Sequence, residues 1–266
     1  MLGAIIGDTI GSLYEWHNIK TTEFPLFSEG STFTDDSVMT VAVAHALLDC
    51  YDCETISESG LVQKMQSYGK MYYDAGYGGK FRRWIKSPYP KPYNSYGNGS
   101  AMRVSPVAWA SDDLAHVEEL AKQTAQVTHN HPEGIKGAQA AAACILMARQ
   151  GASNDEIRAY VDERHGYYLG FKLDDIRPLY GFDVSCQGSV PQAIVAFLES
   201  ADFEDAIRLA VSIGGDSDTI AAIAGSIAQA RYGIPDWIAA ETEKRLTGHL
   251  KSIVELFCQR FGVPSA

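Results

Sequence analysis

Two short polar segments of this sequence each place carboxyl and hydroxyl side chains directly before an alanine-rich apolar stretch. Residues 33–37 read FTDDS and precede VMTVAVAHALL, and residues 214–219 read GGDSDT and precede IAAIAG. Asp, Ser and Thr are preferred at helix N-caps, so capping is the simplest interpretation of either segment alone. Capping uses one side chain, or two in a capping box, and each segment offers more than that. The surplus of oxygen-bearing side chains indicates a second role.

Metal binding is the role that the surplus carboxylates favour. If the two helix starts meet in space, four carboxylates converge without enough cationic side chains to balance them, namely Asp35, Asp36, Asp216 and Asp218. Like charges at short range force some carboxylates to protonate, and bound divalent cations remove that cost. Carboxylate and hydroxyl oxygens suit Mg²⁺, Mn²⁺ or Ca²⁺ rather than zinc, and two ions that share an aspartate are a natural arrangement. The glycines before Asp216 allow the chain to turn tightly at this point.

A glycine-rich segment and a histidine segment offer groups suited to a phosphate or a sugar. Residues 94–103, NSYGNGSAMR, expose backbone N–H groups that can cradle a phosphate, and Tyr96 can stack on a base or a sugar. The alternative is an ordinary tight turn, because the sequence has neither a Rossmann GxGxxG after a strand nor a P-loop GKS/T. In THNHPEG, residues 128–134, His129 and His131 lack a third ligand at metal-binding spacing. Such histidines more often hydrogen-bond within a loop or contact a ligand.

The elements that must position these groups show a helical period, and no convincing run of alternating strands appears. Gly3, Gly7 and Gly11 would share one face of the first helix and permit close approach of a neighbouring helix. On that helix Asp8 is interpreted as a hydrogen-bond partner of a neighbouring loop, and Glu15 is expected at the helix end. We expect helices at about residues 1–14, 38–48, 61–73, 113–127, 135–149, 154–164, 191–199, 202–212 and 220–231, with two more closing the chain.

Local signals define some of these boundaries. Ser153 and Glu156 match a capping box, and Asp202 is expected to cap the helix that follows it. Pro191 is predicted to open a helix after an irregular stretch at residues 165–189.

The remaining composition points to one domain. Residues 76–100 are rich in Gly, Pro, Tyr, Asn and Ser, which predicts a long ordered loop with a functional role. With 46% hydrophobic residues the chain is long enough for one large core, and no linker is evident. We therefore predict a compact all-α fold that forms a single domain over residues 1–266, with functional groups on loops between helices.

Charge and hydropathy disfavour two kinds of partner. The formal net charge is −11, so general nucleic-acid binding is not expected. A small basic cluster could still meet a phosphate, and it comprises Lys80, Arg82, Arg83, Lys86 and Lys91. No window approaches the roughly 18 apolar residues of a membrane span, so no membrane partner is expected.

The cysteines and the N-terminal segment predict a cytoplasmic protein with reduced thiols. The chain has five cysteines, an odd number, and its first residues lack the basic start of a secretion signal. Cys50 and Cys53 form a CxxC by count, but no second pair stands at zinc-site spacing. We interpret them as ordinary thiols.

Together these motifs resemble the ADP-ribosylglycohydrolase family, which includes the dinitrogenase reductase-activating glycohydrolases. The matching pieces occur in family order over nearly the whole chain, and they are GDTIGSLYE at 7–15, FTDDS at 33–37, GYGGKFRRW at 76–84, YGNGSAMR at 96–103, TH at 128–129 and GGDSDTIAAIAGSIAQARYGIP at 214–235. The chain departs modestly from the family pattern at Ser37, Lys80 and Gln192.

The resemblance implies an all-α fold with a binuclear metal centre in a cleft, with Mg²⁺ the expected ion and Mn²⁺ the alternative. Family metal ligands fall on Thr34, Asp35, Asp36, Asp216, Asp218 and Thr219. Positions that hold the diphosphate and the riboses, or lie in the phosphate-side loop, fall on Gly78, Gly79, Ser95, Tyr96, Asn98, Gly99 and His129. The carboxylates expected to act in catalysis are Glu15, Asp35, Asp36 and Asp218.

The activity implied is hydrolysis of the glycosidic bond between ADP-ribose and an acceptor, which releases ADP-ribose. The partner would be an ADP-ribosylated protein, linked through a side chain such as arginine or serine, or a small ADP-ribosyl compound. One alternative is a non-catalytic binder of ADP-ribose or its derivatives. Another is a metal-dependent phosphohydrolase, which would release phosphate or AMP from a nucleotide. The sequence leaves the acceptor and the oligomeric state open.

Overall fold

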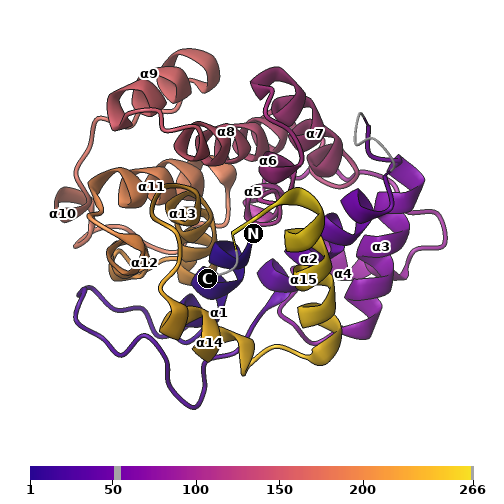
Figure 1. Ribbon diagram of the computed structural model, residues 1–266, viewed down its shortest axis with the longest axis horizontal. Coiled ribbons are helices and arrows are strands. Elements are labelled where there is room, and N and C mark those ends of the chain that lie inside the picture. The colour runs from indigo at the N-terminus through magenta and orange to yellow at the C-terminus, as the bar shows by residue number, and fades with distance from the viewer. Residues whose placement is uncertain (51–54, 265–266) are drawn as a thin grey trace.

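The computed structural model describes residues 1–50 and 55–264, and this part of the chain folds as a layered assembly of helices (Figure 1). Its β pairing is limited to an isolated bridge between Gly97 and Ser185. The prediction of an all-α fold is confirmed. The helices of the described residues are α1 (Leu2–Gly11), α2 (Asp35–Leu48), α3 (Glu58–Met71), α4 (Gly79–Lys86), α5 (Gly99–Met102), α6 (Val107–Ala110), α7 (Leu114–Gln126), α8 (Pro132–Arg149), α9 (Asn154–His165), α10 (Leu173–Ile176), α11 (Cys186–Glu199), α12 (Phe203–Ser212), α13 (Ser217–Tyr232), α14 (Asp236–Glu243) and α15 (Gly248–Phe261).

The centre of the molecule is a close-packed pair formed by α1 and α13. Every residue of α1 is buried. A Cβ added at Gly3 or Gly7 would overlap the backbone of α13, at Gly225 and Ala221 respectively. At Gly11 the added atom would lie 2.5 Å from the Asp218 Cα. The glycine face predicted from the sequence is therefore confirmed, and it fixes the backbone distance between the first helix and the GGDSDT segment.

The other helices surround this pair (Figure 1). On one side α13 packs against α8, α11 and α12, and on the other α2 packs against α1, α3 and α15. Apolar residues from these helices merge into one buried cluster. The arrangement brings the N-terminal ends of α2 and α13 together beside the C-terminal end of α1. No helix in the described parts of the chain has the length and apolar character required to cross a bilayer.

Several predicted boundaries are confirmed. Ser153 and Glu156 form a complete capping box at the start of α9. The Asp202 side chain caps α12 by accepting a hydrogen bond from the Asp205 N–H. The Cys50 thiol donates to the Ala46 carbonyl at 3.4 Å, whereas Cys53 lies outside the described residues.

Three predictions about loops and helix ends were wrong. Residues 76–100 are not one long loop, because α4 forms within them and buries Phe81, Trp84 and Ile85 on one face. The Gly- and Pro-rich flanks obscured this short helical period. Pro191 lies inside α11 rather than at its start. The core-facing side chains of α11 are buried on both sides of Pro191, so their packing offsets the roughly 3 kcal/mol that a helix-interior proline costs.

The end of the first helix also differs from the prediction. The helix α1 ends at Gly11, so Glu15 follows it in a turn. The Tyr14 N–H donates to the Gly11 carbonyl within this turn. The turn directs the chain back toward the N-terminal end of α13, where Glu15 lines a cavity together with Asp216 and Asp218.

Candidate active site

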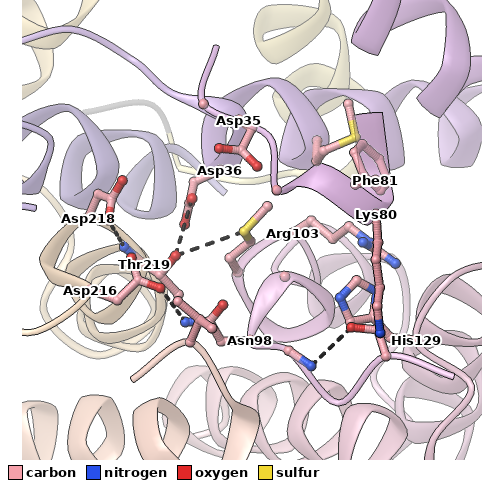
Figure 2. A pocket seen from close by; sticks show the side chains of 18 of the residues that line it. Asp35, Asp36, Lys80, Phe81, Asn98, Arg103, His129, Asp216, Asp218 and Thr219 are labelled. Carbon is pink, nitrogen blue, oxygen red and sulfur yellow. Dashed lines mark hydrogen bonds between the residues drawn. The ribbon is translucent and has the colours of Figure 1, made fainter. Parts of the chain in front are cut away.

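The two polar segments singled out in the sequence meet in the structure. The Thr219 hydroxyl at the start of α13 donates to Asp36 Oδ2 at the start of α2, at 3.2 Å (Figure 2). Two acidic groups form around this junction, and within each of them the carboxylate oxygens lie within 4.8 Å of one another. One group is Asp8, Asp36 and Asp218, and the other is Glu15, Asp216 and Asp218. Asp218 therefore belongs to both groups.

Capping does not account for these carboxylates. At α2 the cap is Thr34, whose hydroxyl accepts from the Asp36 N–H at 3.4 Å. At α13 the N-cap residue is Asp216, yet its side chain makes no capping hydrogen bond. Instead Asp216 Oδ2 accepts from the Asn98 amide at 2.6 Å. The capping role thus falls to a hydroxyl in one segment and to no side chain in the other, which leaves the carboxylates free for another role.

Asp8 is a member of the cluster that the sequence did not mark as a site residue. It is fully buried on α1, where its carboxylate accepts from the Thr34 N–H at 2.8 Å, the Thr34 hydroxyl at 2.7 Å and the Ser37 N–H at 3.0 Å. The Ser37 hydroxyl donates to it as well. The expected hydrogen bonds to a neighbouring segment are confirmed. Because these donors occupy most of its lone pairs, Asp8 serves mainly to hold the start of α2 against α1 and α13.

Burial and mutual repulsion raise the pKa values of the clustered carboxyls. Desolvation is the largest cause for each of them, and the neighbouring carboxylates add to it. The pKa values of Asp35, Asp36 and Asp218 lie well above the ordinary range. Burial raises the pKa of Asp216 to about 6 and that of Glu15 to about 7. The site therefore holds more acidic groups than the protein alone can keep ionised at neutral pH.

The donor set fits hard divalent cations. The members of the cluster are carboxylates and a threonine hydroxyl, the oxygen ligands that Mg²⁺ and Mn²⁺ prefer. Asp36 Oδ1 is buried without a hydrogen-bond partner, although buried polar atoms are normally satisfied. A cation would supply the missing partner and would relieve the repulsion that raises the pKa values.

A cavity of about 410 Å³ opens beside the acidic cluster and reaches the glycine-rich segments (Figure 2). Most of the residues singled out in the sequence line it, namely Glu15, Asp35, Asp36, Gly78, Gly79, Ser95, Asn98, Gly99, His129, Asp216, Asp218 and Thr219. Two are placed elsewhere. Thr34 lies behind the cavity wall in its contacts with Asp8 and Asp36, and Tyr96 is exposed with its ring against His131 at 5.4 Å between centroids.

A buried chain of polar groups fixes the histidine of the cavity. Arg103 is 1% exposed, and its guanidinium donates to the Thr128 hydroxyl and the Thr124 carbonyl, both at 2.8 Å. The Thr128 hydroxyl also contacts His129 Nδ1 at 2.7 Å. Burial, aided by the Arg103 charge, lowers the pKa of His129 well below its ordinary value. His129 is therefore neutral, with its Nε2 toward Gly97 and Gly99.

Sequence reasoning missed several residues that line the cavity, among them Arg103, Trp16 and Phe182. Arg103 is the last residue of the YGNGSAMR motif, and the sequence offers no separate indication of its role. A buried cation beside a glycine loop is typical of a phosphate-binding site. Trp16 and Phe182 also line the cavity, and their exposed rings stack at 5.4 Å between centroids. They come from turns far apart in the chain, so no local pattern could have paired them.

These features define an all-helical protein with a candidate divalent-cation centre at one end of a glycine-lined cavity. Within this class the chain belongs to the ADP-ribosylglycohydrolase family, because the family model of that description matches residues 1–264. The resemblance seen in the sequence is confirmed.

Known proteins of this family are similar over most of the chain. The identity to ADP-ribosylhydrolase ARH3 of Homo sapiens is 27%, covering 88% of this chain and 84% of that protein. The identity to ADP-ribosylarginine hydrolase Tri1 of Pseudomonas putida (strain GB-1) is 26%, covering 90% of this chain and 72% of that protein. A solved structure, the ADP-ribosylglycohydrolase-related protein complex, shares the fold with a TM-score of 0.73 at 23% identity, covering 98% of this chain and 95% of that one.

Proposed function

We propose that this protein is a metal-dependent hydrolase that cleaves the glycosidic bond between ADP-ribose and an acceptor and releases ADP-ribose. The observation that carries the proposal is the pair of acidic groups that share Asp218 at one end of the cavity. The names of the similar proteins support the same reaction class, since they are hydrolases of ADP-ribosyl groups.

Two divalent cations, with Mg²⁺ expected before Mn²⁺, would be held by Asp35, Asp36, Asp216, Asp218 and the Thr219 hydroxyl. The Thr34 hydroxyl, expected as a further ligand, would first have to turn from its hydrogen bond to Asp8. When bound, they supply Lewis-acid activation of oxygen groups. The protein's own part is to hold these ligands rigidly. Asn98 fixes Asp216 by a hydrogen bond of 2.6 Å, and Asp8 fixes the start of α2.

Glu15 is the carboxyl best placed to transfer a proton. It lines the cavity beside Asp216 and Asp218 and is only partly buried, so it can reach a bound substrate. Burial and the neighbouring carboxylates raise its pKa to about 7, where both protonation states are populated at neutral pH. That is the range in which a general acid or base works best. Of the other carboxylates expected to act in catalysis, Asp36 and Asp218 are buried within the acidic groups, and Asp35 lines the cavity at the start of α2.

The opposite end of the cavity suits the diphosphate and the adenosine. Gly78 is the N-cap of α4, and space around its Cα is open, so phosphate oxygens can approach the helix N-terminus. Arg103 supplies a buried positive charge that no carboxylate pairs with among its hydrogen bonds. Ser95, Gly99 and the neutral His129 complete this wall, whereas Tyr96 would need to turn from its contact with His131 to touch a ligand.

The acceptor is proposed to be a protein side chain, with arginine and serine as the first candidates. The name of the Pseudomonas relative supports arginine for that protein. Cys144, Cys186 and Cys258 are free thiols, as expected for the cytoplasmic location that we propose.

The test is incubation of the purified protein with arginine- and serine-ADP-ribosylated peptides, with Mg²⁺, with Mn²⁺ or with a chelator, followed by mass analysis. Metal-dependent release of intact ADP-ribose supports the proposal and identifies the linkage. Release of AMP or phosphate would instead identify a phosphohydrolase. Tight binding of ADP-ribose without release from either peptide or from small ADP-ribosyl compounds would identify a binder.

A further inference from the structure

A second hollow adjoins the cavity on the side away from the acidic cluster. It has a volume of about 350 Å³ and is lined by Lys80, Arg83, Trp84, Ser87, Lys91 and Tyr93. Lys80 and Tyr93 also line the main cavity, so the two spaces share a wall. In Figure 2 Lys80 and His129 both lie on the opposite side of the cavity from Asp216 and Asp218. A group that leaves the main cavity past Lys80 therefore departs from the end opposite the acidic cluster.

The charge of this second hollow is the reverse of that of the whole protein. Three of the lining side chains are cationic and none is acidic, in a chain of formal net charge −11. Lys80, Arg83 and Lys91 make no ion pair with any described residue of the chain. Their charges are therefore not neutralised by a carboxylate of the described residues and are available to an anion.

The basic residues of helix α4 lie on two of its faces. Lys80, Arg83, Trp84 and Ser87 follow the spacing of one helix face and line the second hollow. Arg82 and Lys86 lie over the Tyr73 ring, with the Arg82 guanidinium carbon 5.4 Å and Lys86 Nζ 4.2 Å from its centroid. The basic cluster seen in the sequence is thus divided into cations with an aromatic partner and cations that face open space.

Among the uncharged lining residues, Trp84 is 4% exposed and its indole Nε1 is buried, so it adds little polar surface to the hollow. Ser87 contributes a hydroxyl. A phosphate group accepts several charge-assisted hydrogen bonds at once, and a guanidinium with two ammonium groups matches that demand.

We propose that this second hollow is an anion subsite for a phosphate group carried on the adenosine side of the ADP-ribosyl substrate. The inference rests on the proposed function, because the main cavity must hold the ADP-ribosyl group for its adenosine end to reach Lys80. The phosphate has two chemical sources, a monoester on the adenosine ribose or the diphosphate of a second ADP-ribosyl unit joined there. The protein would then prefer ADP-ribosyl groups that extend beyond the adenosine.

The test compares the binding of three ligands by titration calorimetry at low and high ionic strength. They are ADP-ribose, ADP-ribose with a phosphate monoester on the adenosine 2′-hydroxyl, and a dimer extended at the same hydroxyl. At low ionic strength we expect at least one extended ligand to bind about tenfold more tightly than ADP-ribose, because each exposed ion pair contributes up to about fivefold. The advantage should shrink at high ionic strength, since exposed charges are screened.

The variants test whether the second hollow causes the preference. In R83S/K91S the preferred extended ligand should bind no more than about twofold more tightly than ADP-ribose, because two of the three proposed ion pairs are lost. The matched control is Lys70→Ser, which removes an exposed cation of α3 that lines neither hollow and should leave the preference unchanged. Circular dichroism checks that each variant is folded.

Each outcome bears on the inference in a defined way. A preference for the monoester or the dimer that R83S/K91S removes supports the subsite, and the tighter of the two identifies the source of the phosphate. Equal binding of all three ligands, or a preference that survives in R83S/K91S, overturns the subsite and leaves the proposed function standing. Absence of ADP-ribose binding overturns both.

Discussion

The substitution Asp218→Asn tests whether Asp218 is a metal ligand or a structural carboxylate. Asp218 belongs to both acidic groups, and its Oδ1 accepts from the Thr219 N–H at 2.9 Å. Asparagine retains a carbonyl oxygen for that hydrogen bond and nearly the same volume. The substitution therefore removes an ionisable carboxyl group and leaves the local packing unchanged.

In a chelator the variant should be at least as stable as the wild type. Two unit charges within the 4.8 Å that spans each acidic group repel by about 3 kcal/mol at an effective dielectric constant of about 20. Shared protons already relieve part of that repulsion, because the pKa values of the clustered carboxyls are raised by burial and by one another. We expect a Tm rise of about 2–5 °C at neutral pH, given roughly 2–4 °C per kcal/mol for a chain of this size.

With Mg²⁺ or Mn²⁺ the wild type should be more stable than Asp218→Asn. A ligand at one hundred times its Kd stabilises the folded state by about 2.7 kcal/mol, which corresponds to a Tm rise of about 5–10 °C for the wild type. Asp218→Asn should lose most of this rise, because both acidic groups lose their common ligand. Release of ADP-ribose should fall at least about a hundredfold.

The assay is a thermal melt with a titration of each metal and a chelator reference. The matched control is Asp113→Asn, which makes the same change at a helix start where the carboxylate is a true cap, accepting from the His116 N–H at 2.7 Å. Asparagine caps as well as aspartate, so this control should shift the Tm by no more than about 2 °C and keep the full metal response. The reasoning is refuted if Asp218→Asn is destabilised in chelator yet retains the metal-dependent Tm rise.

Three further predictions follow from the packing and the charges of the site. Gly7→Ala should lower the free energy of unfolding by about 3 kcal/mol in denaturant melts, because its Cβ would overlap the Ala221 backbone. The control Gly248→Ala meets no neighbour and should be nearly neutral. Equal stabilities of the two variants would contradict the close helix contact. In chelator, the free energy of unfolding should fall as pH rises from about 4 to 7, because carboxyls with a raised pKa bind more protons in the folded than in the unfolded state. A series of melts in which stability rises over that pH range would contradict this prediction. Asn98→Ala should reduce metal-dependent turnover about 10–100-fold by releasing Asp216, and unchanged kinetics with unchanged metal affinity would show that this hydrogen bond is dispensable.

The sequence was a good guide to the class of fold and to the chemical identity of the site. Apolar periodicity and capping residues predict helices locally, and the glycine spacing of the first helix predicts a close helix contact because glycine has no Cβ. The oxygen-bearing side chains of residues 33–37 and 214–219 indicate hard-cation chemistry because ligand preference depends on residue type alone. None of these inferences needs the distance between residues far apart in the chain.

The tertiary structure decided which groups meet. Thr219 and Asp36 are 183 positions apart and touch only because α1 and α13 pack backbone to backbone and hold α2 beside them. The same packing brings Asp8 into the cluster, leaves Asp216 without a capping contact, and raises the pKa of Glu15 to about 7 by burial. Residue types set the chemistry that is available, whereas proximity and desolvation arise from side-chain packing across the whole core, so the site could be completed only in three dimensions.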